Sequence, residues 1–160
     1  MKQITEYLST KVVKPSIIRA IDYTIHKIVK DELNRLGHDA NLNHIDVSEV
    51  TYMNNLFSCV SMDLGEKYND LNPDISNWDV SNVESMQWMF WKCKNFNCDI
   101  SQWNVSKVKY MKGMFWFCES FNQDLSNWDT RSIKVEYDRD NVFSHCPIQE
   151  KYMPKFNPKF

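Results

Sequence analysis

The chain repeats itself every 25 residues, and this period restricts the possible folds more than any other feature of the sequence. Aspartate, serine and tryptophan recur together at this spacing in three successive units, and Met, Phe and Cys positions follow them in the same order. The most regular sets are Asp74, Asp99 and Asp124, and Trp78, Trp103 and Trp128. A single unit of this length cannot bury its apolar side alone, so neighbouring units must stack on a common core.

Two less regular units flank the central ones. Residues 45–57 match residues 78–90 at an offset of 33, which is one period plus eight, and the extra length lies around the polar segment SMDLGEKYND. At the other end, Phe143 follows Phe115 by 28 residues, which is one period plus three. We therefore predict an array of about four units over residues 42–146.

Within a unit the apolar spacing changes from one typical of a strand to one typical of a helix. Residues 99–105 carry Ile, Trp and Val as a short buried strand would, and Ser81 with Glu84 has the capping-box arrangement that begins a helix. The helical face would consist of Val108, Met111, Met114 and Phe115. The predicted fold class is an α/β repeat solenoid, similar to a leucine-rich repeat, with a short strand and a short helical turn in each 25-residue unit.

Both ends of the array are predicted to be capped. Residues 14–38 have isoleucines at helical spacing, Pro15 suits the first turn of a helix, and Gly37 suits its end. We therefore expect an N-terminal helical cap within residues 1–41. A C-terminal cap is expected at residues 147–160, where the apolar residues are Tyr152, Met153, Phe156 and Phe160.

The repeat text FNCDISQWNVSKVKYMKGMFWFC and its neighbours resemble the BspA-like leucine-rich repeats, also known as the DUF285 or mycoplasma-lipoprotein repeat. The resemblance covers roughly residues 42–146 and implies a protein-interaction role, because larger members look like surface adhesion proteins. We expect the chain to differ from those members, because no secretion signal, lipoprotein cysteine near the start or cell-wall anchor is recognisable in this sequence. It looks like a short cytoplasmic member of the kind carried by phages and prophages.

Composition and charge argue against several classes of protein. The net charge is −2, and only three glycines are present, so neither a nucleic-acid-binding surface nor a glycine-rich phosphate loop is expected. No apolar run approaches the roughly 18 residues of a transmembrane helix. Five cysteines without a secretion signal are expected to be reduced thiols in the cytoplasm of a bacterium, where phage infection is one possible setting.

The recurrent polar and sulfur-containing residues are interpreted as structural. Aspartates repeated at a turn are expected to accept hydrogen bonds from nearby serine and backbone N–H groups, because no stretch has the ligand spacing of a calcium loop. The three repeated tryptophans are expected to pack along the core. Cys93, Cys118 and Cys146 are expected to form one buried column. We therefore predict no metal, no cofactor and no enzymatic activity.

The residues with the strongest indication of function lie just beyond the Met-Phe pairs. Aromatic residues cluster there within a basic surround, as at interaction hot spots, although packing between units explains them equally well. The candidate partner-binding residues are Trp88, Trp91, Trp116, Phe117, Lys92 and Lys112. The leading prediction is a module that binds another protein. The alternatives are a phage-encoded inhibitor of a host defence protein or nuclease, acting by acidic mimicry of nucleic acid, and an adhesin fragment.

Overall fold

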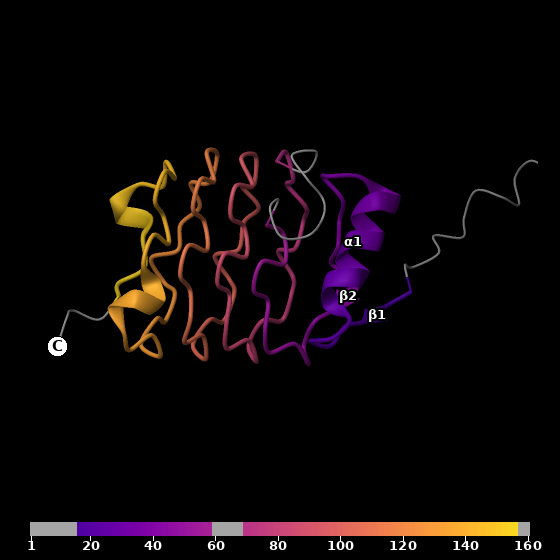
Figure 1. Cartoon of the computed structure of the whole chain (residues 1–160), viewed down its shortest axis with the longest axis horizontal. Helices are drawn as coiled ribbons and strands as arrows, with labels where there is room; N and C mark the ends of the chain where they lie inside the picture. The colour runs from indigo at the N-terminus through magenta and orange to yellow at the C-terminus, as the bar shows by residue number, and fades with distance from the viewer. Residues whose placement is uncertain (1–15, 59–68, 157–160) are drawn as a thin grey trace, which may run out of the picture.

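A computed structural model describes residues 16–58 and 69–156, in which the chain winds through successive coils that lie side by side along the long axis (Figure 1). These residues contain one α-helix, α1 (Ile25–Leu36), and two short strands, β1 (Ile18–Arg19) and β2 (Ile45–Asp46), paired in parallel. Two 3-10 helices, η2 (Glu136–Arg139) and η3 (Glu150–Tyr152), lie near the C-terminal end. Pro15, Phe160 and most of the segment SMDLGEKYND fall outside the described residues.

The predicted fold class, an α/β repeat solenoid with a strand and a helical turn in each unit, is wrong. Residues 69–135 contain no helix, and their only β-structure consists of isolated bridges. The predicted strand at residues 99–105 instead contains one tight turn, and a second tight turn begins at its last residue, Val105. The Trp103 N–H donates to the Ile100 carbonyl at 3.1 Å, and the Val108 N–H donates to the Val105 carbonyl at 2.9 Å. The apolar spacing therefore reflects which turn residues point inward.

The helical turn predicted after Ser106 is also wrong. In a helix the Phe115 N–H would donate to the carbonyl four residues earlier, but it donates to the Val142 carbonyl of the next coil at 2.8 Å. The Met114 N–H closes a tight turn on the Met111 carbonyl at 3.2 Å. Inside this turn Gly113 adopts the left-handed region, with φ of 61°. Tight turns and helices share a three-residue apolar spacing, which is why the sequence pattern was ambiguous.

Backbone hydrogen bonds join each coil to the next one. At one corresponding place in successive coils, N–H groups donate to carbonyls of the following coil at 2.7–2.9 Å: Met53 to Ser85, Met86 to Tyr110, and Met111 to Asp138. Glu84 takes part in a similar contact, because its N–H donates to the Thr51 carbonyl at 2.8 Å. It therefore caps no helix, and the predicted capping box with Ser81 is wrong.

Aromatic rings from successive coils stack inside the molecule. Phe57, Phe90 and Phe115 are fully buried, and the ring centroids of successive members lie 5.4 Å apart. A second column of Phe96 and Phe121 lies beside the first, with the Phe96 and Phe90 ring centroids 3.9 Å apart. Each column therefore consists of phenylalanines that occupy equivalent positions in successive coils and stack on one another.

Helix α1 covers the open side of the first coil (Figure 1). Its buried face includes Ile25, Val29 and Leu33, and it ends at Gly37, whose φ is 97° and whose N–H donates to the Leu33 carbonyl. The sequence pattern predicts a helix over residues 14–38. Its end is correct, because α1 stops at Leu36, but its start is wrong, because α1 begins only at Ile25. The Asp22 carboxylate holds the preceding segment against the first coil, where it accepts the Thr51 N–H at 2.6 Å.

A buried carboxylate also fixes α1 to the first coil. Glu32 is 8% exposed, and its carboxylate accepts hydrogen bonds from Arg35 Nε at 3.1 Å and from His44 Nε2 at 2.8 Å. The hydrogen bonds from Arg35 hold the pKa of Glu32 below its ordinary value of 4.5, against the opposing effect of burial. The carboxylate is therefore more stable in the folded chain than in the unfolded chain.

We expect Glu32→Gln to lower the free energy of unfolding at pH 7 by roughly 1.5–3 kcal/mol, the range for hydrogen bonds to charged groups. Because the pKa of Glu32 is depressed on folding, its contribution is present above pH 4.5 and is lost as the pH falls through the folded-state pKa. The difference between wild type and variant should therefore shrink below pH 4.5, as measured by urea unfolding across pH. A difference that stays constant with pH would contradict this role.

Candidate interaction surface

Four planar side chains from three coils stack in a continuous series on one side of the molecule, which we call the aromatic row. Trp91 and Trp116 stack with ring centroids 5.8 Å apart, and Trp116 and Phe117 with centroids 5.4 Å apart. The row ends at His145, whose ring is parallel to that of Phe117 at 4.3 Å. His145 is exposed and the other three residues are half-buried. All four residues are therefore at least partly accessible to solvent.

Trp88 lies beside this row. A Cβ atom on Gly113 would lie 2.6 Å from Trp88 Cδ1 and 3.7 Å from Trp116 Cε3, so the Trp88 indole covers Gly113 next to the Trp116 ring. The Trp88 N–H donates to the Lys112 carbonyl at 2.9 Å. The structure therefore brings Trp88 together with Trp91, Trp116 and Phe117.

Two of these aromatic residues have left-handed backbones. The φ angles are 53° at Trp88 and 62° at Phe117, a conformation that costs roughly 1–2 kcal/mol for residues with a side chain. The places equivalent to Trp88 hold Asn55, Gly113 and Asn141, residue types that tolerate this region. The turn itself therefore does not require Trp at position 88.

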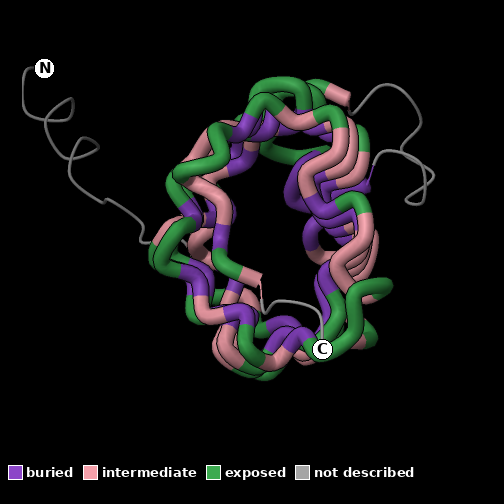
Figure 2. The backbone as a smooth tube through the Cα atoms, turned by 90° about the vertical axis from the view of Figure 1, so that its left-hand side faces the viewer, coloured by how far each residue is buried: buried purple, intermediate pink, exposed green. Residues whose placement is uncertain are grey.

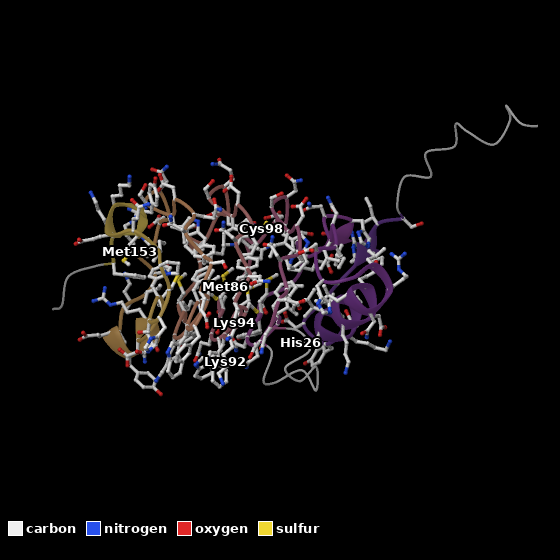
Figure 3. All side chains as sticks on the ribbon, turned by 90° about the horizontal axis from the view of Figure 1, so that it is seen from above. His26, Met86, Lys92, Lys94, Cys98 and Met153 are labelled. Atoms are coloured by element: carbon white, nitrogen blue, oxygen red, sulfur yellow. The ribbon has the colours of Figure 1, made fainter. Side chains whose placement is uncertain are left out.

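The two candidate lysines lie over aromatic rings. Lys92 Nζ is 5.3 Å from the Trp91 ring centroid, and Lys112 Nζ is 3.4 Å from that of Tyr137. Figure 3 shows Lys92 and Lys94 on one side of the molecule, Cys98 towards the other, and Met86 between them. Lys92 therefore lies against a ring of the aromatic row and Lys112 against Tyr137, and in both cases the charge is held against a π face.

The repeated aspartates lie in the turns. Asp74, Asp99 and Asp124 each accept, through Oδ1, the N–H of the serine two residues later, at 3.0–3.1 Å. Hydrogen bonds from Ser126 hold the pKa of Asp124 below its ordinary value. Burial raises the pKa of Asp74, but hydrogen bonds from Ser76 and from a nearby asparagine outweigh burial, and the pKa lies below its ordinary value. These carboxylates are thus engaged by the chain itself.

The repeated tryptophans lie in the core. Trp78, Trp103 and Trp128 are 4–5% exposed, and each indole Nε1 donates to a carbonyl of the preceding coil. Trp91 differs from them, because its buried Nε1 has no hydrogen-bond partner among the described residues. A buried unpaired donor costs about 1–3 kcal/mol. Trp91 is therefore a poor choice for stability alone, whereas the three core tryptophans are fully satisfied.

The repeated cysteines do not share one environment. Cys93 and Cys118 are fully buried, and each thiol donates to a phenylalanine carbonyl of the preceding coil at 3.0 Å. Cys146 is half-buried, and its thiol donates to the Phe121 carbonyl at 3.3 Å. Burial raises the pKa of the Cys146 thiol to about 11. The Cys146 thiol is therefore neutral at pH 7.

Sequence reasoning missed two residues of this surface. His145 continues the row because it follows Phe117 by 28 residues, the same offset that relates Phe143 to Phe115. That alignment was sufficient to find it. Tyr137 lies in η2, outside the regular pattern, and its position under Lys112 has no signal in the period.

The described residues provide neither grouped ligands for a metal ion nor a helix that could cross a membrane. Within residues 16–58 and 69–156, no three side chains of His, Cys, Asp or Glu are grouped so that they could hold a metal ion. The helices of the described segments are also too short or too polar to cross a membrane.

Comparison with known proteins places the chain in a family. Residues 32–155 match the family described as "Mycoplasma protein of unknown function, DUF285", so the chain belongs to the DUF285 family. The resemblance noted from the repeat text is thereby confirmed. Neither the curated proteins nor the solved structures yielded a significant match.

Proposed function

We propose that this chain is a non-enzymatic module that binds another protein through the aromatic row, with Trp88, Lys92 and Lys112 beside it. The continuous stack from Trp91 to His145 is the observation that supports the proposal. Tryptophan and tyrosine dominate interface hot spots because they offer rigid apolar area at low cost in conformational entropy.

The contrast with the core tryptophans supports a role beyond packing. Trp103 has a satisfied indole and is nearly inaccessible, whereas Trp91 is half-buried and its indole N–H has no partner in the described part of the chain. Trp88 and Phe117 also occupy left-handed positions that other coils fill with Asn, Gly, Lys or His. Local strain of this kind is a reason to infer function.

Acidic mimicry of nucleic acid has less support. Mimicry requires carboxylates that are free to imitate phosphates, whereas the repeated aspartates accept hydrogen bonds within their own turns. Asp129 is also paired with Arg131 Nη2 at 2.7 Å. Docking through aromatic residues is therefore the preferred proposal.

We expect the double variant Trp91→Ser with Trp116→Ser to lose partner affinity by roughly thirtyfold or more, the loss typical of hot-spot residues. The measurement is affinity capture from host lysate followed by titration of the captured protein. Tyr23→Ser is the matched control, since Tyr23 is 96% exposed and precedes α1 at the other end of the molecule. Circular dichroism establishes that both variants fold. Undiminished binding by a folded double variant would exclude the aromatic row as the interface.

A further inference from the structure

The last coil ends the stack with a row of backbone donors. Asn141, Phe143 and His145 stand where Gly113, Phe115 and Phe117 stand one coil earlier. In that earlier coil, the three N–H groups donate to carbonyls of the next coil at 2.8–3.0 Å. In the last coil, the N–H groups of Asn141, Phe143 and His145 have no hydrogen-bond partner among residues 16–58 and 69–156. Figure 2 looks onto this end of the molecule.

This edge offers donors without matching acceptors. The carbonyls of Asn141 and Phe143 already accept the N–H groups of Ser144 and Cys146, at 3.3 and 3.1 Å. The intervening carbonyls, such as that of Val142, accept N–H groups of the preceding coil. The donors are two residues apart, which is the spacing at which one edge of an extended chain presents its carbonyls. A ligand for this edge must therefore supply a row of acceptors.

A second copy of this chain does not fit the edge. Two last coils placed face to face would oppose one row of donors to another. In head-to-tail stacking, the acceptors would come from the first coil, where α1 packs and the Asn54 carbonyl is already bonded to His26 Nε2 at 3.0 Å. Both arrangements of two copies are therefore disfavoured.

We propose that the edge formed by Asn141, Phe143 and His145 binds an extended segment of another protein, which lies parallel to residues 141–145 and accepts all three N–H groups. Parallel alignment is expected because successive coils run in the same direction. The proposal rests on the function proposed above and specifies its partner. An aromatic side chain of the segment would stack on the accessible face of His145 and extend the aromatic row by one ring.

The test uses the full chain, labelled for nuclear magnetic resonance, and a synthetic peptide with the sequence of residues 137–146 carrying Cys146→Ser. This peptide imitates one more coil in the required register. At a saturating, millimolar concentration we expect amide exchange at Asn141, Phe143 and His145 to slow at least tenfold. Exchange at Asn104, in an exposed turn of another coil, should not change. Unaltered exchange at the three amides would overturn the proposal.

Replacing His145 tests the stacking separately. His145→Gly keeps the N–H and suits the left-handed backbone, with φ of 57°, but removes the ring. It should weaken peptide binding by roughly two- to tenfold, the range for an aromatic pair. The control Asn127→Gly, at an exposed site elsewhere, should leave affinity unchanged. Equal affinity for His145→Gly and wild type would remove stacking from the proposal.

The two proposals fail in different ways. A captured partner that depends on Trp91 and Trp116 but leaves exchange at Asn141, Phe143 and His145 unchanged would refute the edge and support the aromatic row. Slowed exchange with the peptide, together with capture that does not depend on the tryptophans, would refute the aromatic row and support the edge.

Discussion

Replacing Trp103 by alanine should lower the free energy of unfolding by about 3–5 kcal/mol, the usual cost of truncating a large buried aromatic residue. The side chain is 4% exposed, and its ring centroid lies 6.5 Å from that of Phe90. Its Nε1 also donates to the Ile75 carbonyl at 3.3 Å, and the substitution removes this hydrogen bond, although the carbonyl still accepts the Trp78 N–H at 3.1 Å. Small domains have only about 5–15 kcal/mol of stability. The variant should be largely unfolded or melt far below wild type.

Trp103→Phe separates the two contributions. Phenylalanine keeps most of the apolar volume and removes the N–H, so it should cost about 1–3 kcal/mol, from the smaller ring and the lost hydrogen bond to the Ile75 carbonyl. Urea unfolding followed by circular dichroism measures both variants. A cooperative transition for Trp103→Ala close to that of wild type would show that the neighbouring coils do not depend on this ring.

Gly113→Ala should lower the free energy of unfolding by about 2–4 kcal/mol, through two effects. The alanine would be held at φ of 61°, in the left-handed region. Its Cβ would also lie 2.6 Å from Trp88 Cδ1 and 2.9 Å from Trp88 Nε1, which is too close for either pair of atoms. The Trp88 indole must therefore move away from the surface beside Trp116.

A double-mutant cycle with Trp88→Asn isolates the steric effect. Asparagine suits the left-handed backbone at position 88, as at Asn55 and Asn141. In this background Gly113→Ala should cost only the backbone part, about 1–2 kcal/mol. Chemical denaturation of the four proteins gives the coupling energy. Equal costs in the two backgrounds would mean that the indole does not constrain Gly113.

Binding through the aromatic row should respond to Gly113→Ala as well, because displacement of Trp88 alters the surface next to Trp116. This links the stability of one turn to the proposed function. Stability and binding are connected because Gly113 has no Cβ atom and so leaves room for the Trp88 indole. The equivalent positions in two other coils carry asparagine.

The family and the candidate surface were accessible to sequence reasoning to different degrees. The repeat text pointed to the DUF285 family, and the period placed Trp91 and Trp116 at equivalent positions from the sequence alone. Only the three-dimensional structure showed their stacking at 5.8 Å and the left-handed backbone at Trp88. It also showed that the Trp91 indole N–H has no partner among the residues that the structure describes. Propensity argues against Trp in a left-handed turn, so no local rule would have predicted the last feature.

The sequence by itself determined which residues recur at equivalent places, because a stack of coils repeats one environment at one period. It did not determine the backbone. A spacing of three between Met111 and Met114 suits a helix and a tight turn equally well, and the hydrogen bonds that decide between them come from another coil. The Phe115 N–H, for example, finds its acceptor at Val142, 27 residues later. Tertiary structure also decided where the stack ends. Helix α1 covers the first coil, and in the last coil the N–H groups of Asn141, Phe143 and His145 have no partner within residues 16–58 and 69–156.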